Sequence, residues 1–211
     1  CAGPRNSLQP VNLRRLPWVD DRSKWLWLSG CATIFDHSIR QGEAALKLDD
    51  DHLYHGGALI QIAEHDKFTA INSLKVGQDR YPNAYRINDD VAVYFKYSSK
   101  PKKPHDEYVF TFKSEHLDDL REISKHCRKA YIALVCVGDR EVCCLNSDEL
   151  FEMIDSRKKA KGGVEDQYTV LVTAPAGKSL RAYVNAPGAK GKILGELLKI
   201  PRNLFPEVAF A

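Results

Sequence analysis

Residues 91–97 (VAVYFKY) form the most apolar strand-like run of the chain, and they carry a lysine, Lys96, near their end. The run directly follows an acidic turn at residues 88–90. A buried ammonium group is costly unless it meets a carboxylate, a phosphate or solvent. The sequence therefore predicts a sheet strand on which Lys96 either faces an anion or lies on a side that water reaches.

The chain of 211 residues is long enough for one substantial core, and we expect one domain with a smaller appendage. Hydrophobic residues make up 44% and charged residues 28%, which is typical of a globular protein and too apolar for a disordered one. No apolar stretch approaches the ~20 residues that span a bilayer. The chain starts without the basic and apolar segments of a secretion signal, so we expect a cytoplasmic protein with no membrane partner.

Hydrophobic periodicity predicts both helices and strands. Between residues 58 and 137 the predicted order is helix, strand, strand, strand, helix, strand, at 58–74, 84–87, 91–97, 108–112, 114–127 and 130–137. A proline-rich loop joins the strands at 91–97 and 108–112, which predicts that they are antiparallel neighbours. Further along the chain, the pattern predicts strand, helix, strand, strand at 141–145, 148–157, 168–173 and 180–185.

These elements predict an α/β (α+β) fold with a mixed central sheet flanked by helices and a C-terminal β-hairpin appendage. The basic, glycine-terminated stretch at residues 157–163 marks the start of the appendage. We therefore divide the chain into an irregular aromatic and basic N-terminal arm (1–40), an α/β core (41–160) and a basic hairpin appendage (161–211).

The cysteines and histidines do not form a recognisable metal motif. The six cysteines include no C-x-x-C pair, and Cys136 and Cys143 fall on adjacent predicted strands, which indicates reduced thiols in the core. His52-x-x-His55 has metal-ligand types at close spacing, but the two glycines that follow favour a surface loop.

The element order over residues 58–137 resembles the core of the restriction-endonuclease-like, or PD-(D/E)XK, superfamily. The resemblance implies an acid on the second strand and an Asp/Glu-x-Lys motif on the third, which hold Mg²⁺, often with a Glu on the first helix. Glu64 matches the helix acid, and Asp90 or its neighbour Asp89 matches the second-strand acid. Glu107 precedes the third strand without a lysine two positions on, and Lys96 lies one strand earlier.

The resemblance implies that Lys96, Asp90 and Glu107 form the catalytic group, and that Glu64, Asp90 and Glu107 ligate Mg²⁺. Lys96 would then face the scissile phosphate. Carboxylates near turns are usually solvated, so the same residues also fit a surface without a metal. A non-cleaving member of the fold would also account for the degenerate third-strand motif.

Positive charge is concentrated toward the C-terminus. Residues 157–203 hold ten Lys or Arg against three acids, a net charge of +7 in a chain whose overall charge is +3. Such a segment can steer a polyanion, and it can equally be a solvated basic surface. The residues that we expect to contact nucleic acid lie in this segment and in the basic loop at 100–104: Lys100, Lys102, Lys103, Lys178, Arg181, Lys190, Lys192 and Arg202.

The sequence leaves three functions open. We expect first a nucleic-acid-associated protein that is a divergent Mg²⁺-dependent endonuclease, and second a non-catalytic module that binds nucleic acid or protein. The third is a structural subunit whose apolar arm docks on a larger assembly, and a homo-oligomer is compatible with all three. We rank nucleic-acid association first and leave catalysis open, because the superfamily resemblance fails at the third-strand motif.

Overall fold

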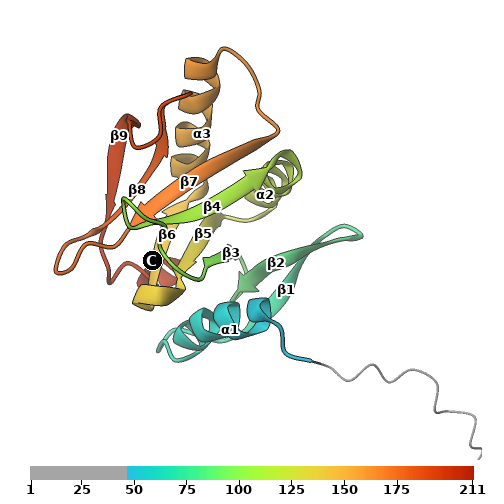
Figure 1. The fold of residues 1–211 in the computed structure, drawn as a ribbon. Coiled ribbons are helices and arrows are strands. Elements are labelled where there is room, and N and C mark those ends of the chain that lie inside the picture. Colours follow the sequence, from blue (N-terminus) through green and yellow to red (C-terminus); the bar gives the residue numbers. More distant parts are fainter. Residues whose placement is uncertain (1–46) are drawn as a thin grey trace, which may run out of the picture. The chain divides into compact units, whose positions relative to one another are not determined.

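Three α-helices and nine strands make up residues 47–211, the part of the chain that this computed structural model describes (Figure 1). Residues 47–211 belong to one compact unit. The predicted N-terminal arm, residues 1–40, lies outside the described residues. Helices and strands interleave along the chain, which confirms the α+β fold class.

Sheet A is the mixed central sheet that the sequence predicts. Its five strands are, in spatial order, β1 (Ile71–Val76), β2 (Asp79–Ile87), β3 (Val91–Ser98), β5 (Lys129–Cys136) and β6 (Glu141–Asn146). β1, β2 and β3 form an antiparallel meander, β3 and β5 are parallel, and β6 is antiparallel to β5. A parallel pair requires a crossover connection, and here β4 and the second helix provide it.

Sheet B is antiparallel throughout and combines one strand from the middle of the chain with three C-terminal strands. Its order is β4 (Glu107–Lys113), β7 (Gln167–Thr173), β8 (Leu180–Asn185) and β9 (Ile193–Ile200). The prediction that the strands at 91–97 and 108–112 are neighbours is wrong, because β5 occupies the place beside β3 and β4 pairs with β7 over its whole length. The predicted hairpin appendage therefore shares a sheet with the predicted core.

The three helices are α1 (Asp50–Ala63), α2 (Ser114–His126) and α3 (Ser147–Lys161). The Asp49 side chain accepts a hydrogen bond from the backbone N–H of His52, and the two residues form a capping box at the start of α1. This cap starts the helix well before residue 58. His52 and His55 are therefore helical, and the prediction of a surface loop around them is wrong.

The predicted helix at 58–74 is also wrong in its second half, where β1 replaces it. The pairing of β1 with β2 shifts register between Ser73 and Lys75. From Ser73 to Lys75 β1 advances by two positions, while β2 advances by five from Tyr85 to Arg80, so the irregularity lies in β2. The apolar residues of β1 are Ile71, Leu74 and Val76, which lack the period of two that identifies a strand in a sequence.

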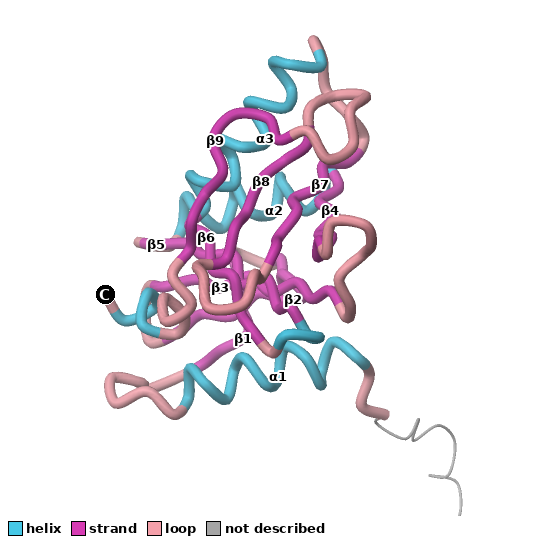
Figure 2. The backbone as a smooth tube through the Cα atoms, turned by 60° about the vertical axis from the view of Figure 1, so that its left-hand side comes forward, coloured by secondary structure: helices cyan, strands magenta, loops and turns pink. Residues whose placement is uncertain are grey.

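Sheet A separates two hydrophobic cores. Figure 2 shows α1 below the strands of sheet A and the strands of sheet B above them. The first core is formed with sheet B, α2 and α3, and it includes Ile132 and Phe110. The second is formed on the other face with α1 and the short 3-10 helix η2 (Glu207–Phe210), and it includes Ile62 and Phe95. Both faces of sheet A are thus covered. β4 buries every second residue toward the first core, and its alternate residues are half-buried on the outer face of sheet B.

The cysteines of β5 and β6 belong to these cores. Cys136, Cys143 and Cys144 are buried and free, which confirms the prediction of reduced core thiols at these positions. Burial raises the pKa of each of these thiols far above its ordinary value of 9.0, so all three stay protonated at neutral pH.

Candidate functional site

A notch opens beside Lys96 where β2 and β3 separate. The pairing of β3 with β2 ends at Tyr94, whereas its pairing with β5 continues to Ser98. Asn83 of β2 has a left-handed backbone, with φ of 62°, at the point of separation. Asparagine tolerates this conformation better than most residues. The end of β3 that carries Lys96 therefore has an edge that β2 does not cover.

The notch is a cavity of about 230 Å³, and residues from four elements line it. They are Asp51 and His55 of α1, Asn83 of β2, Phe95, Lys96 and Tyr97 of β3, and Val109, Phe110 and Thr111 of β4. We refer to this cavity as the Lys96 notch. It brings an ammonium group, an imidazole, an amide and a carboxylate to one concave surface.

Lys96 is half-buried, and its Nζ lies 5.4 Å from the centre of the Phe112 ring. Among residues 47–211, no carboxylate lies within ion-pair distance of this Nζ. Burial lowers the pKa of Lys96 from its ordinary 10.5, while the charge of Asp51 opposes this shift. The contact with the aromatic ring stabilises the cation only in part.

His55 lines the notch from α1, on the face of β3 that carries Phe95 and Tyr97, whereas the ammonium group of Lys96 lies beside Phe112 of β4. The residue is 3% exposed, and its Nε2 atom is buried without a hydrogen-bond partner among the described residues. Its ring lies 5.6 Å from the Phe95 ring and 5.7 Å from the Tyr97 ring. Burial lowers the pKa of His55 below 6.5, Asp51 opposes this, and Lys96 adds to it. Burial thus favours the neutral imidazole, and the buried Nε2 atom is left without a partner.

A second cavity, of about 490 Å³, adjoins the notch and shares Asp51, His55 and Asn83 with it. Arg80 and His52 also line this cavity, and His52 is exposed. The notch therefore continues into a wider polar groove that α1 and β2 form at the surface.

The structure does not bring the three predicted metal-binding carboxylates together. Glu64 is exposed at the C-terminal end of α1, and Asp90 pairs with Arg128, with 2.5 Å between the carboxylate oxygen and Nε. Glu107 accepts a hydrogen bond of 2.5 Å from the hydroxyl group of Tyr183 in sheet B. Within residues 47–211, no group of three His, Cys, Asp or Glu side chains could hold a metal ion. The predicted Mg²⁺ ligand set does not fit this arrangement.

Lys96 lies on β3, the third strand of the described residues, because β1 precedes β2 and β3. The sequence-based prediction has no strand at residues 71–76 and therefore places Lys96 on the second strand. Tyr94 stands two positions before Lys96, where the motif has an acid. Asp51 is the one carboxylate among the described residues that lines the notch.

Sequence reasoning missed three of the residues around Lys96. Asp51 and His55 are four positions apart, a spacing that places two side chains on one face of a helix. A helix that starts at the Asp49 cap would have put both of them on the face toward β3. Asn83 carried no such signal, because its role depends on where β2 leaves β3.

The predicted nucleic-acid contacts divide into three groups. Lys102, Lys103 and Lys190 line one cavity on the outer face of sheet B, although almost ninety positions separate the two loops that carry them. Arg202 is bound within the fold by Glu141 and by the backbone carbonyl oxygens of Lys178 and Pro175. The other members of the set lie at the surface or at the rim of a different cavity: Lys100, Lys178, Arg181 and Lys192.

Comparisons of the chain with family models, with curated proteins and with solved structures return no match. Within residues 47–211, every helix is too short or too polar to cross a membrane.

Proposed function

We propose that this protein binds nucleic acid and that Lys96 contacts a backbone phosphate in the notch. The observation that carries the proposal is the ammonium group of Lys96, which lines a cavity and has no ion pair among the described residues. A half-buried cation of this kind is stabilised when an anion reaches it. The Asn83 amide and a ring N–H of His55 are further donors on the same surface, and a phosphate group has enough acceptor oxygens for all three.

The lysines of sheet B supply the remaining attraction for a polyanion. Lys102 and Lys190 line a cavity that also contains Val109, and Val109 lines the Lys96 notch as well. The two cavities are therefore neighbours along β4. A strand of nucleic acid that places one phosphate at Lys96 can place the next units against the lysines of sheet B.

Salt-dependent binding tests the proposal. Labelled single-stranded and double-stranded DNA and RNA oligonucleotides are titrated by fluorescence anisotropy at salt concentrations from about 50 to 200 mM. Replacing Lys96 by methionine is expected to reduce the slope of log K against log salt by roughly 0.7 to 0.9, the contribution of one phosphate contact. Lys125→Met is the matched control, because Lys125 is exposed on α2 and lines neither cavity. An unchanged slope in Lys96→Met, or no binding of any oligonucleotide, would refute the proposal.

Hydrolysis of phosphodiester bonds is the second candidate function. It is favoured by Lys96 on the third strand and Asp51 on the first helix, which line one notch together with the neutral imidazole of His55. A neutral imidazole can accept a proton from an attacking nucleophile. The test is incubation of labelled DNA and RNA with the protein in Mg²⁺, in Mn²⁺ and in EDTA. Intact substrate under all three conditions would leave nucleic-acid binding as the function.

A further inference from the structure

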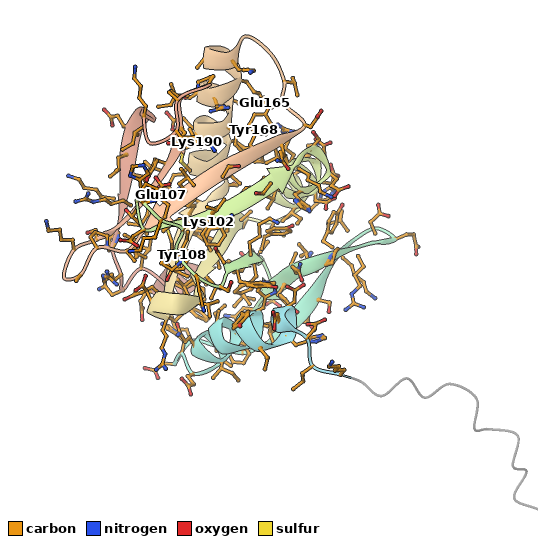
Figure 3. All side chains as sticks on the ribbon, viewed as in Figure 1. Lys102, Glu107, Tyr108, Glu165, Tyr168 and Lys190 are labelled. Atoms are coloured by element: carbon orange, nitrogen blue, oxygen red, sulfur yellow. The ribbon has the colours of Figure 1, made fainter. Side chains whose placement is uncertain are left out.

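A cavity of about 740 Å³ lies on the outer face of sheet B, outside the Lys96 notch. We call it the sheet-B cavity. Figure 3 labels Lys102, Glu107 and Lys190, which come from the loop before β4, from β4 itself and from the loop between β8 and β9. Apolar side chains of two neighbouring strands, Val109 of β4 and Leu171 of β7, also line it.

Two loops meet at one end of this cavity. Gly191 lies so close to His105 that a Cβ atom on the glycine would approach Nε2 of the imidazole to 2.9 Å. Gly191 also has a φ of 77°, which favours glycine. The loop that carries Lys190 is therefore held against the loop that carries Lys102, and the two ammonium groups lie at the same cavity.

The two carboxylates that line the cavity accept hydrogen bonds from other side chains of the protein. Glu165 accepts hydrogen bonds of 2.7 and 2.9 Å from the guanidinium group of Arg157, and Glu107 accepts one from the hydroxyl group of Tyr183. Lys102 and Lys190 take part in no ion pair among residues 47–211. Their positive charges therefore stay available to a ligand, while the negative charge of Glu165 is balanced by Arg157.

The cavity also contains a polar atom without a partner. Oδ1 of Asn185 is buried and has no hydrogen-bond partner among the described residues. The backbone carbonyl of the same residue accepts a hydrogen bond of 2.5 Å from Arg157, which fixes the position of Asn185. A buried acceptor of this kind is costly unless a donor reaches it. A ligand with an amino group beside an apolar ring would supply that donor.

We propose that the sheet-B cavity binds a nucleoside phosphate, either free or as one unit of a single strand. The base lies on Val109 and Leu171 and donates a hydrogen bond from its exocyclic amino group to Asn185. The phosphate lies against Lys102 and Lys190. The volume of the cavity is within the range of about 300 to 1,000 Å³ that small-molecule sites usually have. This site goes beyond the phosphate contact at Lys96, because it recognises a base as well as a charge.

Isothermal titration of the full chain with AMP, CMP, GMP and UMP tests the proposal, with adenosine and inorganic phosphate as the two halves of the ligand. We expect AMP to bind at least tenfold more tightly than either half. Lys190→Met is expected to weaken AMP binding roughly tenfold or more, the usual effect of one charge-assisted hydrogen bond. Lys199→Met is the matched control, since Lys199 is exposed on β9 and does not line the cavity.

Asn185→Ala tests the recognition of the base. It is expected to reduce the preference for bases with an exocyclic amino group over UMP, which lacks one, without changing the affinity for inorganic phosphate. The thermal melting of each variant is recorded to show that it is folded. No binding of any mononucleotide at millimolar concentration, or equal affinities of Lys190→Met and Lys199→Met, would overturn the proposal.

Competition separates the two sources of the ligand. If a single-stranded oligonucleotide displaces AMP, the cavity holds one unit of a strand, and if it does not, the cavity holds a free nucleotide; either result supports the site. Oligonucleotide binding through Lys96 without any mononucleotide binding would refute this inference alone. Mononucleotide binding without any oligonucleotide binding would instead refute the proposed function alone.

Discussion

Replacing Arg157 by methionine removes three hydrogen bonds from the wall of the sheet-B cavity. Two of them reach Glu165 at 2.7 and 2.9 Å, and the third reaches the carbonyl oxygen of Asn185 at 2.5 Å. Hydrogen bonds to charged groups contribute about 1.5–3 kcal/mol each, but the two side chains are 20% exposed, so water replaces part of the loss. We expect the free energy of unfolding to fall by about 2–3 kcal/mol, which lowers Tm by roughly 5–10 °C for a unit of this size.

The contribution of the Arg157–Glu165 pair to stability falls as the pH is lowered. The hydrogen bonds from Arg157 hold the pKa of Glu165 below its ordinary value of 4.5. A carboxyl group whose pKa falls on folding stabilises the folded state fully above its unfolded pKa, and it loses this contribution as the pH drops through the folded pKa. Glu165→Gln is therefore expected to destabilise the protein at pH 7 and to have little effect well below pH 4.5.

Chemical unfolding followed by circular dichroism measures both effects at pH 7 and at pH 3. Lys125→Met is a suitable control, because Lys125 and its partner Glu122 are 68% and 40% exposed, and such surface pairs contribute less than about 1 kcal/mol. Two results would refute the reasoning: a loss in Arg157→Met no larger than the loss in Lys125→Met, or a loss in Glu165→Gln that is the same at both pH values.

Three further predictions concern the notch and the core. Asp51→Asn removes a negative charge from the Lys96 notch and should strengthen oligonucleotide binding several-fold in the anisotropy titration, whereas it should abolish cleavage if the notch hydrolyses phosphodiesters. Asp90→Asn should change neither property, because Asp90 pairs with Arg128 and does not line the notch, and the same two assays check this. Cys144 should resist alkylation at pH 8 in the native protein and react after unfolding, as peptide mass mapping would show, because burial raises the pKa of its thiol.

The sequence predicts those parts of the fold that depend on local pattern. The strands at 91–97 and 130–137 and the helix at 114–127 lie within one or two residues of β3, β5 and α2, because their apolar periods are regular. The parts that fail depend on non-local pairing. The choice of β4 between two sheets is decided by β7, more than fifty positions away, and no local pattern encodes that choice.

The same distinction applies to the candidate site. Lys96 was identified from the sequence because a lysine in an apolar strand is a local anomaly, and the structure gives it a cavity. The sequence groups Lys96 with Glu64, Asp90 and Glu107 by their order in the chain. These carboxylates do not meet, because each lies in a different part of the structure. Asp51 and His55 would have been found by placing the start of α1 at the Asp49 cap.

The two cavities meet at β4, which limits how one strand of nucleic acid could occupy both of them. Val109 lines both the Lys96 notch and the sheet-B cavity, and residues of a β-strand that share a face are about 7 Å apart. Neighbouring phosphates of an extended single strand are separated by a similar distance, so one nucleotide spans about two residues of a β-strand. Under the proposed binding mode, one short strand would place a phosphate at Lys96 and a base on Val109 and Leu171. A dinucleotide or trinucleotide should accordingly bind more tightly than a mononucleotide, and Lys96→Met should remove this gain and leave the affinity for AMP unchanged.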